Sequence, residues 1–233
     1  MWFIDRLKDL TILMDWKQFI PSLVATFVGI FVPFWIQAHQ DKKRKRKDAL
    51  LKLSQIYKEL TEVKSKIIDH EMRAENGSVF IEAIKAPIGD GLLKTKEIQL
   101  LADLQKHLNK KFKRNKTMHD VVKNDWHKRI IEVYADIVTY NILWNKFAEQ
   151  IFFMRNHFVC ESNEPETKKI PLTDREQMLY DQAYQTLQTI EERRKALALE
   201  ITGESGNMTE LLKWLKPICE PNEKNLGEIS NEK

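Results

Sequence analysis

The chain has 233 residues, 31% of them charged, and a formal net charge of +4. That length fits one membrane anchor and one domain, and the charged fraction excludes a protein built mainly of membrane-spanning helices. Seven glycines and seven prolines are too few for a many-stranded β fold. We therefore predict an all-α protein, with one N-terminal transmembrane helix followed by a cytoplasmic antiparallel helical bundle.

Residues 1–17 carry apolar side chains at helical spacing. The apolar positions are Phe3, Leu7, Leu10 and Met14, with Trp2 and Trp16 nearby. Steps of three and four residues put them on one face of a helix. We predict an amphipathic interfacial helix that lies on the outer face of a membrane; the alternative is a disordered lead-in.

The segment 18–40 is the predicted transmembrane helix, because it contains no charged side chain. Its apolar part, residues 19–38, is about 30 Å long as a helix, which matches the hydrocarbon thickness of a bilayer. Trp16 and Trp35 lie where an interfacial aromatic belt is expected. A cleaved signal peptide is disfavoured because the apolar run is long, and a buried core helix because of its length and flanks.

Six basic residues follow the span directly and set its predicted orientation. This basic run consists of Lys42, Lys43, Arg44, Lys45, Arg46 and Lys47. Before the span, basic and acidic residues balance. The positive-inside rule therefore places Met1 outside and the C-terminal domain in the cytoplasm, at a bacterial inner membrane. The basic run is also expected to contact the headgroups of membrane lipids.

Small residues and a proline mark a predicted association face on the span. These residues are Ser22, Ala25, Gly29 and Pro33. The four-residue spacing of Ala25 and Gly29 lets two helix backbones approach closely, and Pro33 removes a hydrogen bond and favours a bend. A homo-oligomer through this face is one interpretation. The other is that small residues and proline are common in membrane helices.

Residues 41–77 are predicted to form a basic juxtamembrane run and a stalk helix that continues the span. Its apolar positions are Ala49, Leu53, Ile56, Leu60, Val63 and Ile67. Their alternating spacings of four and three fit either a coiled coil between copies or packing within a bundle. Asn76 and Gly77 supply the predicted end of the helix.

Residues 78–216 are the predicted helical bundle, and residues 217–233 a disordered tail. Within the bundle we expect a loop over 78–91 with a short element near 79–84, helices over 92–113 and 120–158, and a last long helix from Thr173 to about Ile201. Trp144 lies in the middle of the longest apolar stripe and is expected to be buried. Thr173 and Glu176 have the spacing of a capping box.

Six further basic residues form a second candidate site, with no acid among them. This basic cluster consists of Lys106, Lys110, Lys111, Lys113, Arg114 and Lys116. Lipid headgroups are the favoured ligand, because the domain is tethered to a membrane. Nucleic acid or a nucleotide is a less favoured ligand, and a solvated loop is the plain explanation.

Neither a catalytic nor a metal site is predicted, and we expect no cofactor. His119 and His127 are two helical turns apart, about 12 Å, which is too far to share an ion. Cys160 and Cys219 form no CxxC motif, and a cytoplasmic location favours reduced thiols. The chain also has no glycine-rich phosphate loop, GxSxG or HExxH motif.

The expected function is that of a single-pass membrane protein with a helical interaction or sensing domain, and not of an enzyme. The alternative is a membrane-disrupting effector whose spans oligomerise on activation. The layout of one span and a cytoplasmic bundle is similar to that of small membrane effectors in bacterial antiviral systems, although no motif carries the resemblance.

Overall fold

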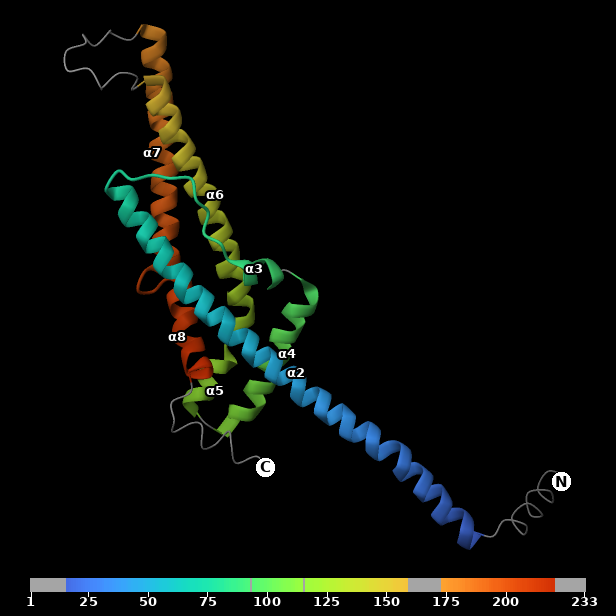
Figure 1. Cartoon of the computed structure of the whole chain (residues 1–233). Coiled ribbons are helices and arrows are strands. Elements are labelled where there is room, and N and C mark those ends of the chain that lie inside the picture. The colour runs from blue at the N-terminus through green and yellow to red at the C-terminus, as the bar shows by residue number, and fades with distance from the viewer. Residues whose placement is uncertain (1–15, 93, 115, 159–172, 221–233) are drawn as a thin grey trace, which may run out of the picture. The chain divides into compact units, whose positions relative to one another are not determined.

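The computed structural model describes residues 16–92, 94–114, 116–158 and 173–220. All regular elements in these ranges are helices, which confirms the predicted all-α class. They are α2 (Trp16–Glu75), α3 (Pro87–Leu92), α4 (Thr95–Lys111), the 3₁₀ turn η1 (Phe112–Arg114), α5 (Lys116–Lys123), α6 (Trp126–Phe158), α7 (Asp174–Thr202) and α8 (Asn207–Cys219) (Figure 1). The predicted interfacial segment, except for its last residues, and most of the predicted tail lie outside the described residues.

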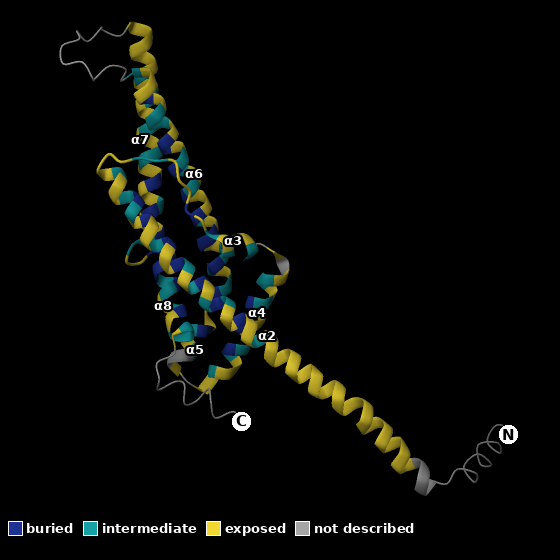
Figure 2. Ribbon diagram, in the orientation of Figure 1, coloured by how far each residue is buried: buried dark blue, intermediate teal, exposed yellow. Residues whose placement is uncertain are grey.

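The chain divides into two compact units, residues 1–48 and 49–233, and α2 contributes to both. In the first unit, α2 continues through Pro21 and Pro33 without a break. Every side chain from Ile20 to Lys45 is exposed (Figure 2). This part of the helix therefore takes no part in the core of the protein.

The second unit has a single hydrophobic core. The apolar stripe of α2 predicted from its heptad spacing lies in this core with side chains of α4, α5, α6, α7 and α8, and each of its six side chains is at most 1% exposed. In the structure the stripe is buried within the chain's own hydrophobic core. These side chains are consequently not available as a coiled-coil seam for a second copy unless the bundle opens.

The end of α2 was predicted correctly, and the backbone shows why. Gly77 has a φ of +72°, a left-handed conformation that favours glycine. The amide of Gly77 donates to the carbonyl of Ala74 at 3.0 Å, and the amide of Ser78 donates to that of Arg73 at 2.9 Å. These are the two hydrogen bonds of a Schellman motif, which satisfies the last free carbonyls of the helix.

The loop predicted over 78–91 is only partly correct. Residues 79–84 form no regular element, and the chain instead forms the short helix α3 from Pro87. Proline is well suited to the first position of a helix, where no backbone N–H is required. Gly89 fits because its missing side chain leaves room for Tyr134, whose ring carbon would lie 2.3 Å from an added Cβ. Pro87 and Gly89 thus lie in the range predicted as a loop, and in the structure they allow a helix to pack closely on α6.

The helix predicted over 120–158 is divided in two by a break at residues 124–125. The side chain of Gln105, buried on α4, explains the break. Its amide nitrogen donates to the carbonyl of Asn124, and its oxygen accepts from the amide of His127 at 3.3 Å. A polar side chain from another helix thus satisfies backbone groups at the junction of α5 and α6.

The last long helix begins as predicted. The hydroxyl of Thr173 accepts from the amide of Glu176 at 3.3 Å, and the carboxylate of Glu176 accepts from the amide of Thr173 at 2.8 Å. This capping box starts α7, which runs antiparallel to α6: Phe158 meets Tyr180, and Phe147 meets Arg194. In the described part of the chain, the first half of α7 lies beside α6, and the two helices form a hairpin at one end of the unit (Figure 1).

Candidate functional site

Among the described residues, α2 is the one helix that is long and apolar enough to cross a membrane. Its large apolar side chains are exposed from Ile20 to Ile36. Phe34 is 69% exposed and Trp35 is 72% exposed. Phe27 and Phe31 stack on each other with ring centroids 4.5 Å apart, along the outside of the helix. The buried core of the protein begins only at Ala49.

The predicted association face lies on this exposed helix. Ser22, Ala25, Gly29 and Pro33 are all exposed. An added Cβ at Gly29 would have no other atom within 4 Å apart from those of its own helix. The hydroxyl of Thr26 donates to the carbonyl of Ser22 at 2.8 Å, so a polar side chain in the apolar stretch is satisfied within the helix.

The basic run surrounds the helix on all sides. Lys42, Lys43, Arg44, Lys45 and Lys47 are exposed, and Arg46 is half-buried. Six consecutive residues of an α-helix, at 100° per residue, point in every direction around its axis. The run is therefore a collar of positive charge and not a one-sided stripe, and none of its residues forms an ion pair with a described residue.

The basic cluster occupies the last turns of α4, the turn η1 and the start of α5. All six of its residues, Lys106, Lys110, Lys111, Lys113, Arg114 and Lys116, are exposed. Phe112 in their midst is half-buried and packs against the core, with the ammonium of Lys111 5.9 Å from its ring centroid. These six side chains therefore lie on three consecutive elements, α4, η1 and α5.

The acids nearest to the basic cluster in sequence do not neutralise it. Asp103 accepts a hydrogen bond from Gln99 at 3.1 Å, and Asp120 lies 4.0 Å from the imidazole of His119. In the described part of the chain, no residue of the cluster forms an ion pair. The cluster is thus a concentration of exposed basic side chains without an ion-pair partner among the described residues.

The position of the basic cluster in the second unit follows from the direction of two helices. Glu59 of α2 accepts a hydrogen bond from Tyr134 of α6, and Glu71 accepts one from Tyr140 at 2.8 Å. The two helices therefore advance in the same direction. The start of α6, with α5 and η1 before it, therefore lies toward the earlier residues of α2 in this unit. Figure 1 shows the hairpin of α6 and α7 at the end opposite α5.

A buried polar cluster that was not predicted from the sequence lies between α2, α6 and α7. Arg194 is 0% exposed, and its Nη1 donates to a carboxylate oxygen of Glu71. The same oxygen accepts from the hydroxyl of Tyr140. The guanidinium lies 5.3 Å from the ring centroid of Trp144 and 4.5 Å from that of Phe147. The ion pair thus joins α2 to α7, and the hydrogen bond from Tyr140 adds α6. Two aromatic rings of α6 lie beside the guanidinium.

Burial changes the protonation of groups around this cluster. The pKa of His70 is lowered, chiefly because burial disfavours its charged form, and its ring centroid lies 4.6 Å from that of Trp144. Burial, followed by the charge and hydrogen bond of Glu71, raises the pKa of Tyr140 far above its usual value. His70 is consequently neutral and Tyr140 remains a hydrogen-bond donor at neutral pH.

The sequence carried a faint signal for Arg194. The apolar stripe of α7 steps from Leu187 to Ile190 and then to Leu197, which leaves a gap of seven residues. Arg194 occupies the missing core position, four residues after Ile190. A charged residue at a core position of an otherwise regular stripe requires a buried partner.

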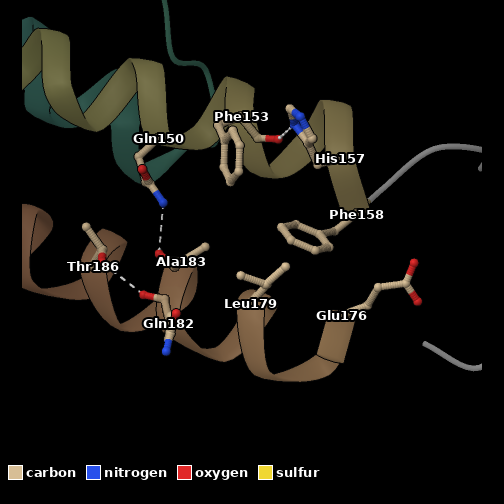
Figure 3. Close-up of a pocket in the computed structure, with 9 residues that line it drawn as sticks. All are labelled: Gln150, Phe153, His157, Phe158, Glu176, Leu179, Gln182, Ala183 and Thr186. Carbon is tan, nitrogen blue, oxygen red and sulfur yellow. Dashed lines mark hydrogen bonds between the residues drawn. The ribbon is translucent and has the colours of Figure 1, made fainter. Parts of the chain in front are cut away.

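The second unit has a cavity of about 480 Å³ between α6 and α7, near the end of their hairpin. Figure 3 shows Phe153 and Phe158 of α6 opposite Leu179 and Ala183 of α7. Gln150 uses its amide to donate to the carbonyl of Ala183 at 3.0 Å. Other polar groups of the lining are also engaged: the carboxylate of Glu176 caps α7, and Nδ1 of His157 lies 2.9 Å from the carbonyl of Phe153. The cavity therefore offers mainly apolar and aromatic contact.

A second cavity, of about 680 Å³, lies between residues 84–90 and α6. Its lining is largely apolar, including Ile84, Pro87, Ile137 and Val138. Asn141 at its edge holds the irregular segment to α6, because its amide exchanges two hydrogen bonds with the backbone of Ile84, at 2.9 and 3.0 Å.

His127 and Cys219 lie in partly buried positions within the fold. Nδ1 of His127 lies 2.7 Å from the side-chain oxygen of Gln105. Burial raises the pKa of the Cys219 thiol to about 12, and Cys160 lies outside the described residues. Within the ranges described, no three His, Cys, Asp or Glu side chains are placed to hold a metal ion.

No family model, curated protein or solved structure matches this chain.

Proposed function

We propose that this chain is a single-pass protein of a bacterial inner membrane, with residues 18–40 as its span and a helical interaction domain in the cytoplasm. The observation that carries this proposal is the contrast between the two parts of α2. From Ala49 onward its apolar stripe is buried in a complete core, whereas from Ile20 to Ala38 its apolar side chains are exposed. An apolar surface of that length needs an apolar environment, and about 20 helical residues match a bilayer.

The orientation rests on the basic run. Its residues surround the helix immediately after the apolar part, and basic residues flanking a span are retained on the cytoplasmic side. The exposed charges also match the anionic headgroups of the cytoplasmic leaflet.

The interaction role rests on the hairpin of α6 and α7. Phe153 and Leu179, which line the cavity of Figure 3, are 43% and 46% exposed. Met178 and Tyr184, on the first half of α7, are 55% and 45% exposed. Tyr180 and Tyr184 stack on each other with ring centroids 6.2 Å apart. Aromatic and Met side chains of this kind are enriched where proteins bind one another.

The proposal is tested by carbonate extraction together with an alkaline phosphatase fused after Lys233, which is active only outside the cytoplasm. The protein is expected to stay in the membrane pellet, and the phosphatase to be inactive. The double variant Val28→Arg with Phe31→Arg should enter the soluble fraction, because two arginines near the centre of a span cost about 5–7 kcal/mol.

The matched control is Leu50→Arg with Leu51→Arg, which adds the same charge at exposed apolar positions beyond the basic run. This control should remain in the pellet. Extraction of the unmodified protein by carbonate would overturn the membrane proposal, and an active phosphatase would overturn the orientation alone.

A second candidate function, a membrane-disrupting effector whose spans oligomerise, is favoured by the open backbone at Gly29. Ser22, Ala25 and Gly29 present small side chains to the exterior of the span, where a second copy can pack closely. In cells, a membrane-potential dye should report depolarisation on induction, and Gly29→Leu should abolish both depolarisation and crosslinking between spans. A wild-type protein that neither depolarises cells nor crosslinks excludes this candidate.

A further inference from the structure

We propose that the basic cluster is a second membrane-contact site, which docks one end of the bundle on anionic phospholipid headgroups. This inference rests on the proposed function, because it takes the span as the anchor. It adds a defined surface, Lys106, Lys110, Lys111, Lys113, Arg114 and Lys116, and a ligand of stated chemistry, the phosphodiester groups of acidic lipids.

The positive charge of the basic cluster matches an anionic membrane surface. The six side chains are exposed, gathered around one tight turn, and form no ion pair with a described residue. The neighbouring acids Asp103 and Asp120 form no ion pair with these six side chains. A surface of this kind attracts anions, and each added basic residue near an anionic leaflet strengthens the attraction.

The short chain between the proposed span and the domain also supports this site. The basic cluster lies toward the end of the bundle that contains Ala49, as the paired directions of α2 and α6 establish. Ala49 follows Gln40, the last residue of the proposed span, by nine residues. Even a fully extended chain of that length reaches only about 32 Å. Whatever the arrangement of the two units, the chain length therefore keeps Ala49 within that distance of the end of the proposed span.

The aromatic content of the cluster favours lipid headgroups over nucleic acid as the ligand. Proteins that bind single-stranded nucleic acid combine basic side chains with aromatic rings on which the bases stack. The cluster contains a single aromatic residue, Phe112, and its ring packs against the hydrophobic core. The cluster therefore offers charge to a phosphate surface and no stacking platform, which favours headgroups.

The experiment is lysine footprinting of the full chain in lipid nanodiscs, read by mass spectrometry after brief treatment with a water-soluble amine-acylating reagent. In discs with 30% phosphatidylglycerol, the lysines of the cluster should react about fivefold more slowly than in pure phosphatidylcholine. About 0.5 M NaCl should restore their reactivity, because it screens exposed charges. Lys146, which is exposed on α6, is the internal control and should react equally in both discs.

A pair of variants tests whether the charges of the cluster cause this protection. The triple variant Lys110→Gln, Lys113→Gln and Arg114→Gln should remove most of the protection of the three remaining lysines, Lys106, Lys111 and Lys116. The matched triple Arg155→Gln, Arg175→Gln and Arg193→Gln removes the same charge from exposed sites elsewhere and keeps Lys146 as the internal control, so it should retain the protection.

Equal reactivity of the cluster in both discs overturns this inference while leaving the span intact, since the protein is still incorporated. Protection in neutral lipid as well points to a protein contact and also overturns it. Protection by an added oligonucleotide, without protection by phosphatidylglycerol, replaces lipid with nucleic acid as the ligand. Failure of the chain to incorporate into discs refutes the membrane proposal itself.

Discussion

The ion pair of Glu71 and Arg194 provides the sharpest test of the bundle. Arg194→Met removes a fully buried cation and leaves the carboxylate of Glu71 with the hydroxyl of Tyr140 as its remaining partner. Breaking a buried pair from one side typically costs about 3–5 kcal/mol. Because the Glu71 side chain is still 19% exposed and can be hydrated, we expect a loss near the lower limit, about 3 kcal/mol.

The converse variant, Glu71→Leu, is expected to cost more, about 4–5 kcal/mol. It leaves the guanidinium of Arg194 without a carboxylate, although Nε and Nη2 of this side chain already have no hydrogen-bond partner among the described residues. It also removes the acceptor of the Tyr140 hydroxyl. The combined variant has no unpaired charge and should lose only about 1–2 kcal/mol, mainly because the Tyr140 hydroxyl is left unpaired.

The assay is thermal unfolding of the full chain in a non-ionic detergent, followed by circular dichroism. A loss of about 3 kcal/mol lowers the midpoint of a domain of this size by about 6–12 °C. The decisive result is the order of the variants: the combined variant must be more stable than either single variant. Additive losses, or an Arg194→Met midpoint equal to that of the unmodified protein, would refute the buried ion pair.

Three further predictions concern the same domain. Trp144→Ala should lower the free energy of unfolding of the domain by about 3–5 kcal/mol, because the ring is 0% exposed and its nitrogen donates to the carbonyl of Phe80 at 2.9 Å. The control Trp35→Ala, at an exposed site in the other unit, should leave the thermal midpoint of the domain unchanged. Equal midpoints for the two variants would show that Trp144 lies outside the core. Burial lowers the pKa of His70, so the unfolded chain binds more protons below about pH 6.5, and stability should fall as the pH drops through that value toward the folded pKa. In His70→Phe this part of the fall in thermal midpoint should disappear, and an unchanged pH profile would contradict the assignment. Finally, the Cys219 thiol, with a pKa of about 12, should resist iodoacetamide at pH 8 in a Cys160→Ser background and react only after unfolding, as measured by mass spectrometry; rapid alkylation of the native protein would show that the thiol is accessible.

Local signals in the sequence determined the ends and faces of several helices. The capping box of Thr173 and Glu176 and the helix stop at Gly77 depend on backbone groups within a few residues, so their chemistry could be read directly. The apolar stripe of α2 and the burial of Trp144 follow from helical periodicity, because the side that carries the apolar residues must face a core. The exposed charges of the basic cluster follow in the same way from their closeness along the chain.

Tertiary structure alone decided which polar residues are paired inside the protein. Glu59, Glu71 and Gln105 resembled ordinary solvated residues on helix faces. Their partners, Tyr134, Arg194 and the α5–α6 junction, are 19 or more residues away in sequence. A helical pattern records only which side of a helix is apolar, and these partners are chosen by the way the helices cross.

The close approach of α3 to α6 has the same origin. In isolation, Pro87 and Gly89 indicate a loop, and only the ring of Tyr134 on another helix explains why a residue without a side chain is required at position 89. The sequence by itself thus determined the helices, their apolar faces and an apolar stretch long enough for a bilayer. The tertiary structure decided the buried ion pair and the helix junctions, because these depend on contacts between segments far apart in the chain.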